Sequence, residues 1–92
     1  MAETRVHIYI SGSVQGVFFR GSIRNKAMEL GVKGYARNLD DGRVYAVLEG
    51  EEASLRKLIE WCKTGPPGAE VEKVEVTSDT YSGEFQTFGI EY

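Results

Sequence analysis

The chain has 92 residues, of which 41% are hydrophobic and 27% charged, and its formal net charge is −3. A chain of this length is typical of one domain with a single core, and its acidic balance argues against a protein that binds nucleic-acid backbones. No apolar run approaches the roughly 20 residues that span a membrane, the first residues contain no signal-peptide core, and the single cysteine fits a reducing cytoplasm.

The first predicted elements are a strand and a helix. Val, Ile and Ile alternate with polar side chains over residues 6–11, which predicts a half-buried strand. Apolar residues at helical spacing then predict a helix over about residues 22–30, and Gly31 is well placed to end it.

A hairpin follows the first helix. Residues 34–39 and 44–50 are predicted as two strands, the second with alternating Val, Ala and Leu side chains. An Asp-Asp-Gly turn at residues 40–42 joins them, with its glycine supplying the positive φ that such turns need.

The second half of the chain predicts a helix and two strands. The helix begins near Glu51, carries one apolar stripe, and stops at a Gly-Pro-Pro-Gly run over residues 65–68. A fourth strand is predicted around residues 73–77, followed by a polar turn around residues 78–83 and a short closing strand at residues 88–92. The apolar stripe consists of Leu55, Leu58, Ile59 and Cys62.

This order of elements predicts an α+β sandwich of the ferredoxin-like β-α-β-β-α-β type, with a mostly antiparallel sheet of four or five strands. The rule that crossover connections are right-handed places both helices on the same face of that sheet. The other face carries His7, Tyr9 and Tyr45, which we expect to point toward solvent.

The connection between the first strand and the first helix is the run Gly12-Ser13-Val14-Gln15-Gly16-Val17-Phe18-Phe19-Arg20-Gly21. A glycine-bearing turn into a helix directs several backbone N–H groups and the helix N-terminus at one point, which is an anion site. The planar guanidinium of Arg20 can bind two phosphate oxygens there. We therefore predict a phosphate site, with the alternative that Arg20 is a surface helix residue balancing an acid.

Two other motifs are only partly present. The Gly-x-x-x-x-Gly spacing at residues 16–21 mimics a nucleotide-binding P-loop, but Ser22 stands where that motif needs lysine. Residues 33–36 match the start of an RNA-recognition strand, but Arg37 and Asp40 occupy the positions of its stacking aromatics. These departures argue against nucleotide hydrolysis and against RNA binding.

Asn38 is the side chain that we pair with Arg20. Its amide presents both a donor and an acceptor to a water molecule if the second strand lies beside the phosphate site. The alternative is that Asn38 begins the following turn, where asparagine is common. One histidine and one cysteine make no credible metal cluster; we expect His7 to face solvent and Cys62 to be a buried hydrophobe.

Two linked segments closely resemble the signature segments of acylphosphatases: Val14-Gln15-Gly16-Val17-Phe18-Phe19-Arg20, and Gly34-Tyr35-Ala36-Arg37-Asn38-Leu39 followed by Gly42-Arg43-Val44. The spacing between the segments matches as well, and a looser resemblance continues to the fourth strand. The resemblance to acylphosphatases implies one acylphosphatase-like domain over residues 1–92, with a ferredoxin-like fold and the activity of hydrolysing the carboxyl–phosphate bond. It also implies a substrate-binding arginine and a water-orienting asparagine, which map onto Arg20 and Asn38.

The residues fit that chemistry. An acyl phosphate releases a carboxylate, whose conjugate acid has a pKa of roughly 4, so its departure needs no general acid. Phosphoryl transfer depends on positioning and charge stabilisation. We expect Arg20 and backbone N–H groups to hold the phosphoryl oxygens while Asn38 orients the attacking water. Those N–H groups belong to Val14, Gln15, Gly16, Val17, Phe18 and Phe19.

We therefore expect a metal-independent hydrolase without a cofactor, acting on a small-molecule acyl phosphate and inhibited by its product, inorganic phosphate. We expect a cytoplasmic monomer that binds neither nucleic acid nor a membrane. The alternative function is a binding module that senses phosphate or an acyl phosphate with little turnover, and RNA binding is a distant third.

Overall fold

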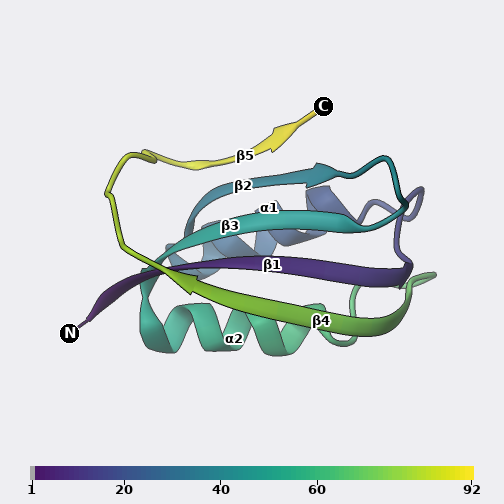
Figure 1. Cartoon of the computed structure of the whole chain (residues 1–92), viewed down its shortest axis with the longest axis horizontal. Coiled ribbons are helices and arrows are strands. Elements are labelled where there is room, and N and C mark those ends of the chain that lie inside the picture. The colour runs from purple at the N-terminus through teal and green to yellow at the C-terminus, as the bar shows by residue number, and fades with distance from the viewer. Residues whose placement is uncertain (1) are drawn as a thin grey trace.

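The computed structural model describes residues 2–92 and contains two helices on one sheet of five strands (Figure 1). The strands lie in the order β4-β1-β3-β2-β5, and every neighbouring pair is antiparallel except β2 and β5. The fold is thus ferredoxin-like, as predicted, with one added edge strand. The elements are β1 Glu3–Ser13, α1 Phe19–Leu30, β2 Lys33–Asn38, β3 Val44–Glu51, α2 Glu52–Cys62, β4 Glu70–Asp79 and β5 Phe88–Glu91.

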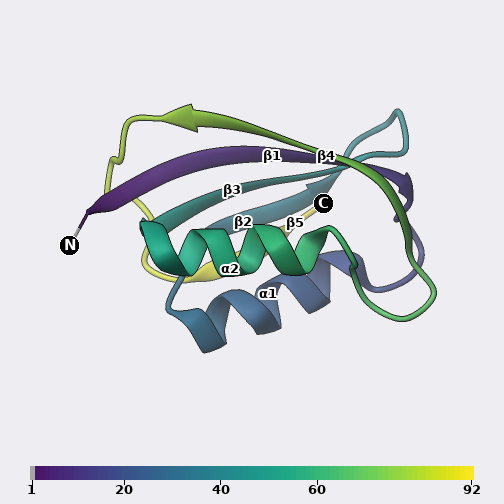
Figure 2. The same cartoon turned by 90° about the horizontal axis from the view of Figure 1, so that it is seen from below.

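Both helices cover the same face of the sheet, which confirms the prediction from crossover handedness (Figure 2). The predicted alternation in β1 holds, because its apolar side chains turn toward the helices and become buried. Burial of this apolar surface is the main force that holds the two layers together. The core between the layers includes Ile8, Ile10, Ala46 and Leu48 from the sheet and Ile23, Ala27, Leu55 and Leu58 from the helices.

The strand β1 is longer than its apolar alternation predicted because it is paired along both edges, with β3 and with β4. Its register with β4 shifts between Ser11 and Gly12. Gly12 has φ +125°, and a Cβ there would overlap the carbonyl oxygen of Glu70. This irregularity needs glycine and turns the end of β1 into the loop that leads to α1.

The helix α1 begins at Phe19, three residues before the predicted start at about residue 22. Phe18 precedes it in the left-handed conformation, and its carbonyl accepts the N–H of Ser22 at 3.0 Å. No Ser, Thr, Asp or Asn marks this start, so the usual sequence signal was missing. Gly31 ends the helix as predicted. Within residues 2–92, no helix is long and apolar enough to cross a membrane.

The C-terminal region differs from the prediction in two places. The strand β4 continues to Asp79, so residues 78 and 79 belong to it and not to the polar turn. They pair with Val6 and Arg5 of β1, and this pairing overrides their polar character. The strand β5 ends at Glu91, which leaves Tyr92 beyond it and 97% exposed.

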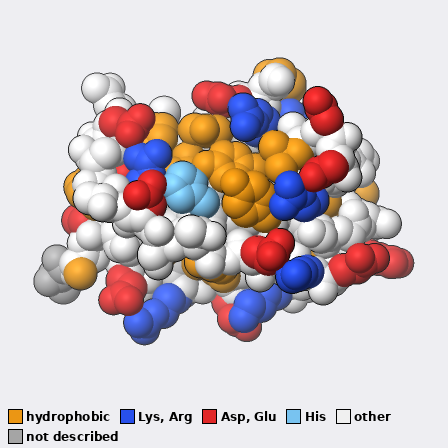
Figure 3. All heavy atoms as spheres, viewed as in Figure 1, with side chains coloured by type: hydrophobic (Ala, Val, Ile, Leu, Met, Phe, Trp, Pro, Cys, Tyr) orange, Lys and Arg blue, Asp and Glu red, His pale blue; other side chains and the backbone are white. Residues whose placement is uncertain are grey.

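Tyr45, which we expected to point toward solvent, is buried on the open face of the sheet. The ring of Tyr9 lies 5.0 Å from it between centroids, and that of His7 lies 5.9 Å away. The hydroxyl of Tyr45 is also 2.6 Å from Nδ1 of His7. Aromatic neighbours thus cover Tyr45, and Figure 3 shows the apolar patch beside the histidine, surrounded by charged side chains.

Candidate active site

The loop between β1 and α1 is fixed at both of its ends. Val14 and Phe19 are buried in the core, and the ring of Phe19 meets Trp61 edge-on at 5.8 Å. Between them, Val17 packs against the core, and Gly16 adopts a positive φ of 79°. The buried anchors therefore hold an exposed backbone segment in one shape, as a preformed anion site requires.

Gln15 joins this loop to the hairpin between β2 and β3. Its Nε2 donates hydrogen bonds to the carbonyl oxygens of Leu39 at 2.8 Å and Arg43 at 3.0 Å. Leu39 directly follows Asn38, so the contact brings the loop and the end of β2 together. The sequence predicted that Gln15 contributes its backbone; the side chain's structural role had no recognisable signal.

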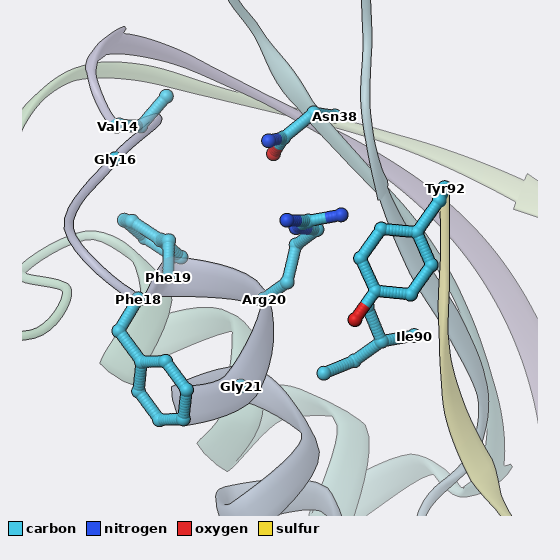
Figure 4. Close-up of a pocket in the computed structure, with 9 residues that line it drawn as sticks. All are labelled: Val14, Gly16, Phe18, Phe19, Arg20, Gly21, Asn38, Ile90 and Tyr92. Carbon is cyan, nitrogen blue, oxygen red and sulfur yellow. The ribbon is translucent and has the colours of Figure 1, made fainter.

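A cavity of about 290 Å³ lies between the loop, the start of α1 and the ends of β2 and β5. Figure 4 shows the guanidinium of Arg20 and the amide of Asn38 pointing toward one another across it. Of the predicted site residues, the side chains of Gln15 and Val17 do not line it. The lining residues are Val14, Gly16, Phe18, Phe19, Arg20, Gly21, Asn38, Ile90 and Tyr92.

Arg20 is held by the C-terminal strand. Its Nη1 donates a hydrogen bond to the carbonyl oxygen of Glu91 at 3.1 Å, and its Cζ lies 4.9 Å from the ring centroid of Tyr92. Within residues 2–92, no carboxylate forms an ion pair with Arg20. The side chain therefore does not balance an acid, and its charge is available to an anion in the cavity.

Asn38 is the last residue of β2, and the hydrogen bonds of the following turn begin one residue later. The N–H of Leu39 donates to the carbonyl oxygen of Arg43, and the N–H of Gly42 donates to the carbonyl oxygen of Leu39. The Asn38 side chain makes no hydrogen bond within the described part of the chain. It points into the cavity (Figure 4), which favours a functional role over a role in the turn.

The electrostatic field at the cavity favours an anion. The N–H groups at the start of a helix have no partners within it and carry partial positive charge. The first turn of α1 contains no acidic residue, whereas α2 begins with Glu52. The cavity is lined by no Asp, Glu, His or Cys among the residues that the structure describes. One guanidinium and the helix terminus therefore act unopposed, despite the acidic net charge of the chain.

The remaining titratable candidates lie elsewhere. His7 is hydrogen-bonded to Tyr45 and Asp79 on the open face of the sheet. Cys62 is fully buried on α2, and burial raises the pKa of its thiol to about 12. Within residues 2–92, no group of three His, Cys, Asp or Glu residues is arranged to hold a metal ion.

The strand β5 supplies lining residues that the sequence did not identify. Ile90 of β5 and Tyr92, which directly follows the strand, form one wall of the cavity, and Glu91 holds Arg20 through its carbonyl. Alternation predicted a short strand here, but gave no indication that it lies parallel to β2, more than 50 residues earlier in the chain. The pairing with β2 is what brings this wall to the site.

The acylphosphatase family model matches residues 6–90, which is nearly the whole of the described chain. The chain belongs to the acylphosphatase family. An acylphosphatase from Pyrobaculum islandicum is 56% identical over 91 residues, covering 98% of this chain and 96% of that relative. The solved structure of an acylphosphatase from Coxiella burnetii superposes with a TM-score of 0.93 and 42% identity, covering 97% of this chain and 93% of that one.

The same fold occurs inside a larger protein. Full-length HypF, solved in a phosphate- and nucleotide-bound form, matches 99% of this chain with a TM-score of 0.90 and 30% identity, but only 12% of HypF is covered. The acylphosphatase relatives, by contrast, match along nearly their full length. The protein is therefore an acylphosphatase that hydrolyses acyl phosphates to a carboxylate and inorganic phosphate.

Proposed function

We propose that Arg20 and Asn38 carry this hydrolysis, with the loop at residues 14–19 as the phosphate-binding backbone. The observation that supports the assignment is the convergence of a guanidinium, an amide and a helix N-terminus on one cavity whose described lining contains no Asp or Glu side chain. Arg20 and the N–H groups of the loop hold the phosphoryl oxygens and stabilise the charge that spreads over them in the transition state.

Asn38 orients the attacking water. Its carbonyl oxygen accepts a hydrogen bond from the water and its N–H₂ donates one to a neighbouring oxygen, so that the lone pair of the water faces the phosphorus in line with the leaving carboxylate. The P–O bond to the acyl group breaks as the bond from water forms, and a proton of the water passes to a phosphoryl oxygen of the substrate, so that the products are the carboxylate and protonated inorganic phosphate. The carboxylate leaves unprotonated, because its conjugate acid has a pKa of roughly 4.

Further properties belong to the same proposal. Residues 1–92 act as one acylphosphatase domain, working as a cytoplasmic monomer on small-molecule acyl phosphates. Inorganic phosphate, the product, competes for Arg20 and inhibits. The reaction uses no metal, cofactor, nucleic acid or membrane partner, because positioning and fixed charge suffice for a substrate with so good a leaving group.

The test is hydrolysis of benzoyl phosphate in the presence of EDTA, comparing the wild type with Arg20→Ala. The variant loses a charged donor, and we expect turnover to fall by at least ~10²-fold, as for a lost oxyanion-hole donor. Arg24→Ala is the matched control, since Arg24 lies on the same helix outside the cavity. Near-normal turnover of Arg20→Ala, or loss of wild-type turnover on chelation, would contradict the proposal.

A further inference from the structure

Glu49 is a buried carboxylate that the proposed reaction does not use. Its side chain is 2% exposed, and it is the one buried charged residue within residues 2–92. Arg5 pairs with it at 3.2 Å. The carboxylate also accepts hydrogen bonds from the N–H and Oγ of Ser82, both at 2.9 Å, and from the N–H of Gly83 at 3.2 Å. A buried charge is stable only when it is paired in this way, so Glu49 and the segment around Ser82 depend on one another.

That segment is the strap, residues 80–87, which joins β4 at one edge of the sheet to β5 at the other. Figure 1 shows it passing the end of the sheet at which β1 begins. The strap has no regular structure, and its side chains are exposed apart from the half-buried Phe85. Within residues 2–92, its one backbone–backbone hydrogen bond runs from the N–H of Gly34 to the carbonyl oxygen of Thr87, at 3.1 Å. The carboxylate of Glu49 is therefore the principal polar anchor of the strap.

The strap leads into β5, the strand that supports Arg20. Glu91 accepts the hydrogen bond of the guanidinium, and Tyr92 makes the cation–π contact with it. This strand has four residues, lies at the edge of the sheet and pairs with β2 alone. Its contact with the core is Phe88, which is 3% exposed. A short edge strand with so few contacts belongs to the part of a fold that opens most readily.

Glu49 itself lies far from the cavity and does not line it. It pairs with Lys33 at the start of β2, whereas Asn38 lies at the other end of that strand, five residues away, which corresponds to about 16 Å along a strand. Any effect of Glu49 on the site must therefore pass through the strap and β5.

We propose that Glu49 is a positioning residue for Arg20: by anchoring the strap it keeps β5 docked on β2, with the carbonyl of Glu91 and the ring of Tyr92 against the guanidinium. The inference rests on the proposed function, because it assumes that Arg20 binds the phosphoryl group. When β5 detaches, the guanidinium loses both supports and takes other orientations. The affinity for phosphate then falls in proportion to the fraction of molecules in which β5 is docked.

The experiment compares the wild type with Glu49→Gln under conditions in which circular dichroism shows both to be folded. We expect KM for benzoyl phosphate and the inhibition constant of inorganic phosphate to rise together by about 3- to 10-fold, as when the docked fraction falls to between a third and a tenth. The value of kcat should stay unchanged, because saturating substrate draws β5 back onto β2. Unchanged constants in Glu49→Gln, or a fall of kcat alone, would overturn the proposal.

The matched control is Leu58→Ala, which destabilises the fold through a cavity at a fully buried position of α2. A merely structural role of Glu49 predicts the same kinetics for both variants. We expect Leu58→Ala to leave KM and phosphate inhibition as in the wild type. Equal rises of these constants in the two variants would assign the effect to lost stability and overturn the proposal.

Hydrogen exchange tests the anchor without any activity. We expect the N–H of Gly34, bonded to the end of the strap, to exchange at least ~10-fold faster in Glu49→Gln, while the N–H of Val32, bonded to Ala27 in α1, keeps its rate. Ser82→Ala removes one bond at an exposed position. It should speed exchange at Gly34 by about 2- to 5-fold, and it keeps the test decisive if Glu49→Gln does not fold.

The two measurements separate this inference from the proposed function. A wild type that neither bound phosphate nor hydrolysed benzoyl phosphate would contradict the proposed function, whatever the exchange rates. Unchanged exchange at Gly34 in both Glu49→Gln and Ser82→Ala would overturn the anchor, even in a wild type with full activity.

Discussion

Arg20 and Glu91 are joined by a hydrogen bond of 3.1 Å from Nη1 of the guanidinium to the backbone carbonyl oxygen. The bond links the second residue of α1 to the last residue of β5, 71 positions apart in the chain. Since a backbone carbonyl bears no net charge, it orients the guanidinium without neutralising it. The strand β5 thus orients Arg20, the residue that we propose binds phosphate.

The ring of Tyr92 provides the second support for Arg20, through a cation–π contact of 4.9 Å. We expect Tyr92→Ala to weaken inhibition by inorganic phosphate by roughly 2- to 5-fold, the range of an exposed cation–π contact, and Tyr92→Phe to preserve it. Competitive inhibition of acyl phosphate hydrolysis measures the effect. Unchanged phosphate inhibition in Tyr92→Ala would show that β5 holds Arg20 through its backbone alone.

Asn38→Ala should affect turnover and phosphate binding differently. Because the proposed partner of Asn38 is the water and not the anion, kcat should fall by at least ~10²-fold while inhibition by inorganic phosphate stays as in the wild type. Asn25→Ala on the exposed side of α1 is the matched control. A parallel loss of phosphate inhibition and turnover would assign Asn38 to the anion.

Gln15→Ala removes both hydrogen bonds between the phosphate-binding loop and the β2–β3 hairpin. We expect the free energy of unfolding in urea to fall by about 1 kcal/mol, as for typical neutral hydrogen bonds. We also expect a higher KM, because the distance between the loop and Asn38 is no longer fixed by these hydrogen bonds. A loss of stability with no change in KM would mean that the two parts of the site keep their positions without this contact.

Glu49 should make stability sensitive to acid. Burial acts to raise the pKa of this carboxyl, but hydrogen bonds from Ser82, Arg5 and Gly83 outweigh it and lower the pKa overall. The carboxylate therefore contributes stability that is complete above its unfolded pKa and is lost as the pH falls through its lower, folded pKa.

Replacing this carboxylate with an amide tests whether Glu49 causes the acid sensitivity of stability. Glu49→Gln puts an N–H₂ group among donors, and we expect it to lower the free energy of unfolding by about 3 kcal/mol at neutral pH and to flatten the acid dependence. Urea titrations between pH 7 and pH 3 measure both effects, with Glu60→Gln in an exposed pair as control. An equally steep acid dependence in Glu49→Gln would place the responsible group elsewhere.

Cys62 should be unreactive in the native protein. Its side chain is fully buried and burial raises the pKa of its thiol to about 12, so almost no thiolate exists at neutral pH. We expect a disulfide reagent such as dithionitrobenzoate to label the protein only in denaturant, at a rate set by unfolding. Rapid labelling of the native protein with loss of activity would show that α2 opens readily.

The elements with periodic burial were predictable from the sequence. Alternation in β1 and the apolar stripe of α2 located both elements, because each has one buried face. The start of α1 was not predictable, since it depends on the left-handed Phe18 and on no capping side chain. Tyr45 was misjudged for a related reason: its burial comes from aromatic neighbours on other positions of the sheet, which alternation within one strand does not reveal.

The site was predictable where its residues lie in one short segment. The run from Val14 to Arg20 forms the phosphate-binding loop through local turn geometry, and Asn38 lies in the second signature segment. The wall made by β5 depends on a parallel pairing with β2 across a long stretch of chain, for which no local pattern exists. The position of this wall is therefore set by a long-range strand pairing, which the sequence alone did not predict.

The place of β5 at the end of the element order affects how the site forms during protein synthesis. A chain leaves the ribosome N-terminal end first, so β1 to β4 and both helices emerge before residues 88–91. The antiparallel core can close while the guanidinium of Arg20 has no β5 carbonyl to bond. A nascent chain can thus close its core before the guanidinium of Arg20 is held by the carbonyl of Glu91, so the phosphate site is completed after the core.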